Sequence, residues 1–186
     1  MKKQLTIIAI SIVIAIFSCN ESGNKKIKET AVSTNTHADD SLLNEARNFF
    51  KPLPSVAANE NNVVTESKVK LGKLLYYDTR LSRTGHNSCN SCHNVANYGV
   101  DNKATSTGDA GKQGNRNSPT VFNAALHNMQ FWDGRAKDVE EQAGMPILNS
   151  VEMAIPHKGF LIDRLSTTKP YPEMFKAAFP EEPKPL

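Results

Sequence analysis

The sequence lacks the features of several common protein classes. It has no pair of alternating apolar and polar runs around a turn, so no β-hairpin is predicted. It has no basic patch of the nucleic-acid-binding kind, and without Lys2 and Lys3 the formal charge of +3 falls close to neutral. Only three cysteines are present, and no second pair of cysteines or histidines accompanies them to complete a zinc site. A nucleic-acid partner and a structural zinc ion are therefore not expected.

Two of the three cysteines belong to one short motif. Cys89, Cys92 and His93 form C-x-x-C-H, the attachment signature of a c-type haem. Two thiols one helical turn apart can each form a thioether with a haem vinyl group, and the adjoining histidine can bind the iron as its proximal ligand. A redox pair, a disulfide and half of a zinc site are the alternatives, but neither a βαβ pattern nor further zinc ligands are present. The motif predicts a covalently bound haem.

The N-terminus resembles a bacterial lipoprotein signal peptide, assigned to residues 1–18. A basic start is followed by an apolar stretch over residues 5–17, which is too short for an ordinary transmembrane helix. Cys19 follows this stretch and has no cysteine left to pair with, which favours its lipidation. An uncleaved anchor and an ordinary secretory signal are the alternatives. The expected location is the periplasmic side of a bacterial membrane, reached through a lipid anchor.

The rest of the chain divides into a tether and a folded domain. Residues 19–40 are polar and cannot bury enough surface to fold alone, so they are predicted to be a flexible tether. Residues 41–186 are long enough for one domain with its own core. Helix signals dominate there, and the predicted helices are residues 41–51, 66–77, 118–129, a segment capped by Asp138 with Glu141, a segment around Leu161 and Leu165, and residues 171–179.

A long polar loop over residues 94–117 follows the haem motif, and a loop of this length is more often functional than accidental. Together with the helix signals and the haem motif, it predicts an all-α domain of cytochrome c type.

Five stretches around the haem motif resemble one family. They are GKLLYYDTRLS at residues 72–82, RNSPT at 116–120, FWDGR at 131–135, EQA at 141–143 and VEM at 151–153. In this order they closely resemble the N-terminal, peroxide-reacting domain of the bacterial di-haem cytochrome c peroxidases, a family that includes MauG-like proteins. The resemblance implies a cytochrome c peroxidase-type haem domain over residues 41–186 that ends in a linker.

The resemblance implies a distal pocket for peroxide. Gln142 and Glu152 match the pair that handles peroxide, and Pro146 matches a residue that lines the same pocket. A carboxylate within reach can move a proton between the two peroxide oxygens, and an amide can orient the molecule. Taken without the family, Glu152 and Gln142 are more commonly polar residues on a helix surface.

The resemblance also implies a route for electrons and a binding site for a second metal ion. Trp132 matches the tryptophan that carries electrons between two haems, although it can equally be a core anchor. Asn117 matches a calcium ligand between two domains. The implied partners are hydrogen peroxide and a small electron-donor protein such as a cytochrome c, and a homodimer is left open.

The sequence departs from the family pattern at two points. In many relatives a histidine in the long loop caps the haem, and Asp109 stands at the matching place, which predicts an open sixth position on the iron. His86, His127 and His157 are the alternatives as a sixth ligand. The chain also contains one C-x-x-C-H rather than two, so it is expected to be the N-terminal part of a di-haem enzyme.

Two other functions compete with peroxide reduction. A mono-haem electron carrier needs a second strong axial ligand, commonly methionine, and Met145 and Met153 follow at plausible separations. MauG-like oxidation of a protein side chain shares this type of domain. The order of the family motifs favours an exported haem peroxidase.

Overall fold

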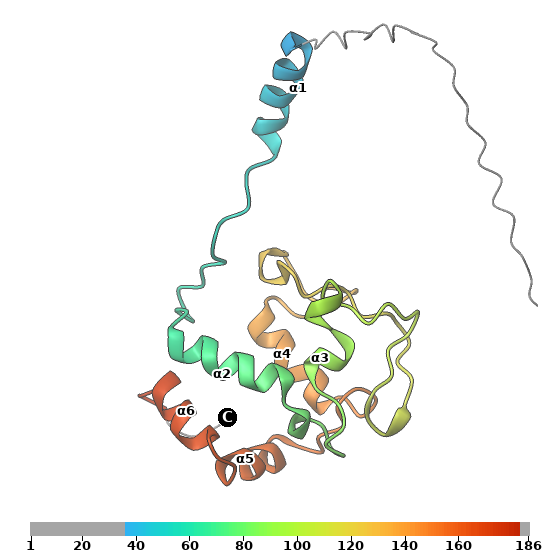
Figure 1. Ribbon diagram of the computed structural model, residues 1–186, viewed down its shortest axis with the longest axis vertical. Helices are drawn as coiled ribbons and strands as arrows, with labels where there is room; N and C mark the ends of the chain where they lie inside the picture. The colour runs from blue at the N-terminus through green and yellow to red at the C-terminus, as the bar shows by residue number, and fades with distance from the viewer. Residues whose placement is uncertain (1–35, 183–186) are drawn as a thin grey trace, which may run out of the picture. The chain divides into compact units, whose positions relative to one another are not determined.

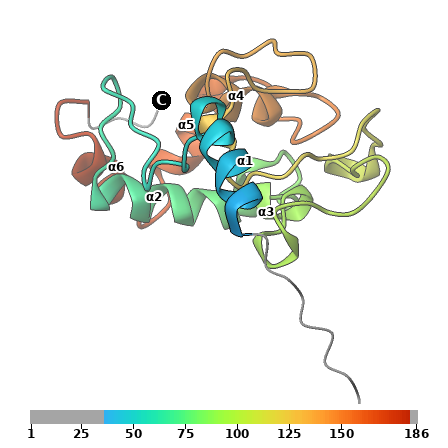
Figure 2. The same cartoon turned by 90° about the horizontal axis from the view of Figure 1, so that it is seen from above.

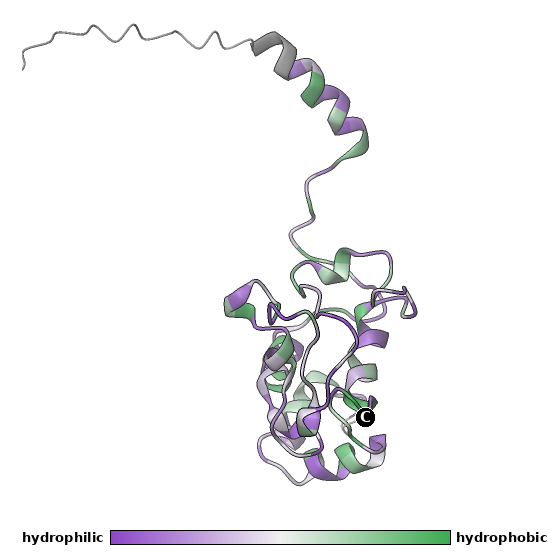
Figure 3. Cartoon of the chain, turned by 90° about the vertical axis from the view of Figure 1, so that its right-hand side faces the viewer, coloured by the Kyte–Doolittle hydropathy of each residue, from purple (hydrophilic) through white to green (hydrophobic). Residues whose placement is uncertain are grey.

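The computed structural model describes residues 36–182 and divides into two units, Met1–Pro52 and Leu53–Leu186. In the described part of the first unit, α1 (Thr36–Phe49) begins before the predicted start at Ser41, so residues 36–40 are helical (Figure 1). Leu42, Leu43 and Phe49 of α1 are exposed, and Figure 3 shows apolar and polar residues interspersed along the helix. The predicted signal peptide and Cys19 lie outside the described residues.

The second unit is helical. Its helices are α2 (Glu66–Tyr77), α3 (Cys89–Cys92), α4 (Val139–Leu148), α5 (Lys158–Ser166) and α6 (Tyr171–Ala178), joined by loops with short 3-10 turns (Figures 1 and 2). Residues 36–182 contain no strand, only two isolated bridges, Thr107 with Gln113 and Gln130 with Ala136. The predicted all-α class is confirmed. None of the helices in this range is both long enough and apolar enough to cross a membrane.

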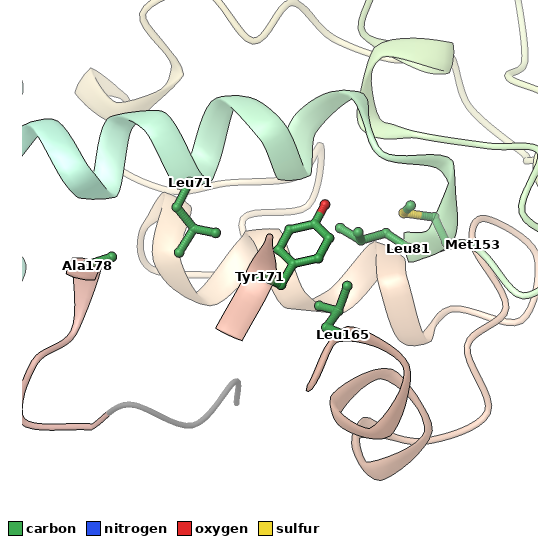
Figure 4. Packing of buried hydrophobic residues seen from close by; sticks show 6 residues of the cluster. All are labelled: Leu71, Leu81, Met153, Leu165, Tyr171 and Ala178. Carbon is green, nitrogen blue, oxygen red and sulfur yellow. The ribbon is translucent and has the colours of Figure 1, made fainter. Parts of the chain in front are cut away.

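The core of this unit lies between α2, α5 and α6. Its buried members are Leu71, Leu81, Met153, Leu165, Tyr171 and Ala178 (Figure 4). The predicted apolar stripes on α2, α5 and α6 supply three of them, Leu71, Leu165 and Tyr171. Each large side chain of this kind contributes about 1.5–3 kcal/mol by leaving water. Because α2 packs against both α6 and α3, the core holds the helical turn that carries the haem motif.

A polar network fixes the turn that leads from α2 to that motif. The hydroxyl of buried Tyr171 donates to Asp78, and Arg80 donates to both carboxylate oxygens, at 2.6–3.0 Å. Burial opposes the ionisation of Asp78, but the hydrogen bonds from Arg80 and Tyr171 outweigh it and hold its pKa below the usual range. Arg164 of α5 donates to the carbonyl oxygens of Arg80 and Ser82, at 2.6 and 2.7 Å. The chain after α2 is thereby tied to α5 and α6.

The helix predicted from Ser118 does not form. Only the 3-10 turn Ala124–Leu126 lies within residues 118–129, and Asn123 before it has a left-handed φ of 58°. The Ser118 hydroxyl bonds to that of Ser106 at 2.6 Å instead of capping a helix. The carbonyl of Pro119, which a helix would use internally, lies 3.0 Å from Nδ1 of His93. Contacts with the haem motif therefore override the local helix signal.

Candidate haem site

A single cavity collects the residues that the sequence singled out. Its volume is about 660 Å³, within the ordinary range for a small-molecule or cofactor site. The wall includes all of the predicted site residues within the described range: Cys89, Cys92, His93, Asn117, Trp132, Gln142, Pro146 and Glu152. Segments that are up to 63 positions apart in the sequence (residues 89 and 152) therefore meet at one site.

The haem motif forms one helical turn on the cavity wall. The backbone N–H of His93 donates to the carbonyl of Cys89 at 2.9 Å, which closes the turn, and the N–H of Ser88 donates to Ser91 Oγ at 3.0 Å. The two thiols are not bonded to each other. Burial raises the pKa of both thiols, so each stays protonated near neutral pH. Two adjacent neutral thiols on a cavity wall fit the attachment of haem vinyl groups.

The ring of His93 is set up to bind a metal through one nitrogen. Nδ1 lies 3.0 Å from the carbonyl oxygen of Pro119. A carbonyl can only accept, so in this pair Nδ1 carries the hydrogen, and in neutral imidazole Nε2 is then left free as a ligand. Hydrogen bonds of this kind fix the orientation of metal-binding histidines. The motif and its supporting carbonyl therefore fit a haem iron.

Tyr76 supports the backbone of the same residue from α2. Its hydroxyl donates to the carbonyl oxygen of His93, and its side chain lines the cavity. Burial, with smaller effects from Cys89 and Tyr77, raises the pKa of Tyr76 to about 12. The phenol therefore stays protonated and remains a donor near neutral pH.

Helix α4 places Gln142 and Pro146 on one side, four residues apart. Asp138 accepts from the N–H of Glu141 at 2.8 Å, which confirms the predicted N-cap, while the Glu141 carboxylate accepts from the N–H of Lys137. Pro146 has no N–H to donate to the carbonyl of Gln142, so the helix is weakened next to the cavity.

Glu152 follows α4 and is turned back toward it. The carbonyl of Pro146 accepts from the N–H of Met153 at 3.2 Å, and Asn149 Nδ2 donates to Glu152 Oε1 at 2.9 Å. Burial raises the pKa of Glu152, and the charges of Arg135 and His93 and the Asn149 hydrogen bond only partly offset it. The cavity therefore contains a carboxyl group that exchanges protons closer to neutral pH than an ordinary glutamate.

Trp132 lies at the rim of the cavity. Its side chain is 60% exposed, which argues against a core anchor, and its Nε1 donates to the carbonyl of Asn117 at 3.2 Å. Nearby, Arg135 Nη1 donates to both carboxylate oxygens of Asp133, each at 2.9 Å. The Arg135 guanidinium lies 3.5 Å from the centre of the Phe131 ring. Arg135 and Arg116 also line the cavity, where they are available to acidic groups of a bound haem.

The calcium ion predicted at Asn117 stays a prediction. Calcium takes about six to eight oxygen ligands, most of them carboxylates and carbonyls. The carbonyl of Asn117 already accepts from Trp132, and Asp133 is paired with Arg135. Across residues 40–182, no group of three or more histidine, cysteine, aspartate or glutamate side chains could hold a metal ion.

Of the alternative sixth ligands for the haem iron that the sequence suggested, only Met153 lies on the cavity wall. His86, His127, His157, Asp109 and Met145 are not on the cavity wall, and His157 Nδ1 instead accepts from the N–H of Phe160 at the start of α5. Met153 is on the wall but also belongs to the buried core, with 6% of its surface exposed.

Several supporting groups were not identified from the sequence. They are the Pro119 carbonyl, the Tyr76 hydroxyl and the Asn149 amide. The only sequence signal for Tyr76 and Pro119 is that each lies inside one of the family-like stretches, and Asn149 has none.

Comparisons with known proteins agree on one family. The model of the di-haem cytochrome c peroxidase family matches residues 66–185. Cytochrome c551 peroxidase of Pseudomonas aeruginosa is 46% identical over 149 residues, which cover 79% of this chain and 42% of that protein. Methylamine utilization protein MauG of Paracoccus denitrificans is 37% identical over 141 residues, covering 66% and 36%.

A solved structure gives the same result. The crystal structure of a MauG-like protein associated with microbial copper homeostasis superposes with a TM-score of 0.64 at 30% identity, over 74% of this chain and 41% of that one. This chain spans about two fifths of the length of these relatives.

Replacing both Cys89 and Cys92 by serine is expected to abolish covalent haem attachment, because no thiol remains to form a thioether. Intact-mass spectrometry of protein matured with haem should show the apoprotein mass for the double variant and the haem adduct for either single variant. Cys19→Ser is the matched control and should keep the adduct. A haem adduct on the double variant would show that the haem is held elsewhere.

Proposed function

This chain belongs to the di-haem cytochrome c peroxidase family, and we propose that it reduces hydrogen peroxide to water with electrons from a small redox protein such as a cytochrome c. One observation carries the proposal: Glu152 and Gln142 lie on the wall of the same cavity as Cys89, Cys92 and His93. An electron carrier needs the last three residues but has no use for an acid and an amide at the same site.

The residues on the cavity wall have different proposed roles in haem binding. Cys89 and Cys92 would hold the haem covalently, and His93 would bind its iron through Nε2, while the Pro119 carbonyl fixes the ring. When bound, the haem would supply the redox chemistry at this site. Arg116 and Arg135 are the cationic residues of the wall available to its carboxylates.

Glu152 is proposed to transfer a proton between the two oxygens of the peroxide. Reduction of hydrogen peroxide consumes two electrons and two protons and yields two water molecules. Glu152 takes the proton from one peroxide oxygen and delivers it to the other, which leaves as water. Gln142 holds the peroxide by hydrogen bonding from the same cavity, and Asn149 holds the Glu152 carboxylate by its 2.9 Å hydrogen bond.

Trp132 is placed to pass electrons from a partner into the cavity. It is exposed at the rim while it remains part of the cavity wall. The family is a di-haem one, and the sequence contains one C-x-x-C-H, so we place this chain as the N-terminal part of a di-haem enzyme. In such an enzyme, Trp132 would be the residue through which electrons from the donor protein enter the cavity. A homodimer stays a prediction.

A mono-haem electron carrier is the second candidate because Met153 lies on the cavity wall. Its side chain packs in the core with Leu81 and Tyr171. Movement of this side chain to an iron ligand position would open the core at a cost of about 2–5 kcal/mol. Peroxide reduction needs no such rearrangement and is therefore preferred.

The proposed location rests on the N-terminus. An exported protein with a lipid on Cys19 should sediment with membranes, because several acyl chains give stable anchoring. Cys19→Ser is expected to move the protein into the soluble fraction and to abolish its labelling by radioactive palmitate during growth. Equal membrane association and labelling of the variant would contradict lipidation at Cys19.

The rate of reaction with peroxide is expected to depend on pH through Glu152. Only the ionised carboxylate accepts a proton, and burial raises its pKa, so the rate should rise with pH through a midpoint above that of an ordinary glutamate. Glu152→Gln should lower the rate by about 100-fold or more and remove this step from the profile. Stopped-flow measurements from about pH 4 to about pH 9 would show it, because buried glutamates can have pKa values of up to about 8–9.

Glu173→Gln, on α6 away from the cavity, is the matched control and should leave both the rate and the profile unchanged. A Glu152→Gln variant that keeps the wild-type pH profile would remove Glu152 from the mechanism.

A further inference from the structure

Asp109 is a buried carboxylate that the proposed chemistry does not use. Only 1% of its surface is exposed, although the cavity wall does not include it. A carboxylate is costly to bury unless hydrogen bonds compensate it. Oδ1 of Asp109 accepts from the hydroxyl of Thr84 at 2.5 Å and from the N–H of Thr84 at 3.3 Å. The side chain thus joins two segments that lie 25 positions apart.

The backbone of the same residue is bonded to the segment that carries the proton-transfer residue. The N–H of Asp109 donates to the carbonyl of Glu152 at 2.6 Å. The preceding residue allows this approach, since a Cβ on Gly108 would lie 1.9 Å from the carbonyl oxygen of Val151 and 2.8 Å from that of Glu152. Only glycine fits at this contact.

The segment that leads into Thr84 is bonded to α5 and to the residue after Glu152. Arg164 of α5 donates to the carbonyls of Ser82 and Arg83, at 2.7 and 3.3 Å, directly before Thr84. The N–H of Arg83 donates to the carbonyl of Met153 at 2.8 Å, so the same segment also bonds to the residue after Glu152. Thr84, Gly108 and Asp109, which we call the clamp, therefore lie between the core and the backbone of Glu152.

We propose that Asp109 is a positioning residue for Glu152: through Thr84 and its own N–H it fixes the backbone from which the Glu152 carboxylate enters the cavity. This inference rests on the proposed role of Glu152 in proton transfer. A proton-transfer group works only within hydrogen-bond reach of its partner, and a displacement of about 1 Å can cost a factor of about 100 in rate. Asn149 donates a hydrogen bond to the carboxylate of Glu152, and the clamp donates one to its backbone carbonyl.

A double-mutant cycle tests whether Asp109 acts through Glu152. In haem-loaded full-length protein, Asp109→Ala is expected to lower the stopped-flow rate constant with hydrogen peroxide by up to about 100-fold and to shift the pH profile. In the Glu152→Gln background the same substitution should cost nothing further. An equal loss in both backgrounds would overturn the proposal.

Two further variants separate positioning from folding. Thr84→Val removes the hydroxyl and keeps the shape, and it should reproduce the effect of Asp109→Ala without adding to it. Asp109→Asn keeps an oxygen that accepts from Thr84 and should restore most of the rate. The matched control is Gln113→Ala, which removes a 2.9 Å bond to Thr107 inside the same loop and should behave as wild type. A wild-type rate in Thr84→Val, or a Gln113→Ala loss equal to that of Asp109→Ala, would contradict the clamp.

Hydrogen exchange measures the clamp without reference to activity. Thr84→Val and Asp109→Ala should both accelerate amide exchange in peptides that cover residues 106–112 and 149–154, while Gln113→Ala leaves the second peptide unchanged. Unchanged exchange in residues 149–154 would overturn the proposal. If wild-type protein fails to react with peroxide while this exchange pattern holds, the proposed function has failed and the clamp has not.

Discussion

The hydrogen bond between His93 Nδ1 and the carbonyl of Pro119 is the contact on which the arrangement of the site depends. It fixes the histidine tautomer that leaves Nε2 free for iron. It also requires residues 117–120 to run past the haem motif as non-helical chain, which brings Asn117 onto the cavity wall and lets its carbonyl accept from Trp132. One contact thereby connects the proximal ligand to the rim where electrons are proposed to enter.

Three of the helices that could be predicted from the sequence are stabilised by a continuous apolar stripe, whereas α4 was predicted from its Asp138 N-cap. Leu71 on α2, Leu165 on α5 and Tyr171 on α6 show this pattern and meet in the core. The helix predicted from Ser118 failed for the opposite reason. Its Ser-Pro start is a good local signal, but its carbonyl and hydroxyl groups are used by His93 and Ser106. Such competition between segments is invisible to local patterns.

The residues of the candidate site also divide into those with a local sequence signal and those without one. Cys89, Cys92 and His93 follow from one local motif, whereas Glu152 and Gln142 stood out only by their resemblance to a family. Thr84 and Asp109 support Glu152 through contacts between distant segments, whereas Asn149 lies only three residues before it. In the sequence Thr84 and Asn149 look like ordinary loop residues, and Asp109 stood out only because it stands at the place of a histidine in related proteins. Burial is what distinguishes Asp109 from them, and burial is a property of the folded chain.

The central claim is that one cavity combines a haem held by Cys89, Cys92 and His93 with a face open to peroxide beside Glu152. The most direct test is the absorption spectrum of the haem-loaded ferric protein before and after one equivalent of hydrogen peroxide. We expect a high-spin resting spectrum that changes rapidly with peroxide and recovers when a reduced cytochrome c is added. A low-spin spectrum that is indifferent to peroxide would contradict it and would favour Met153 as a sixth ligand.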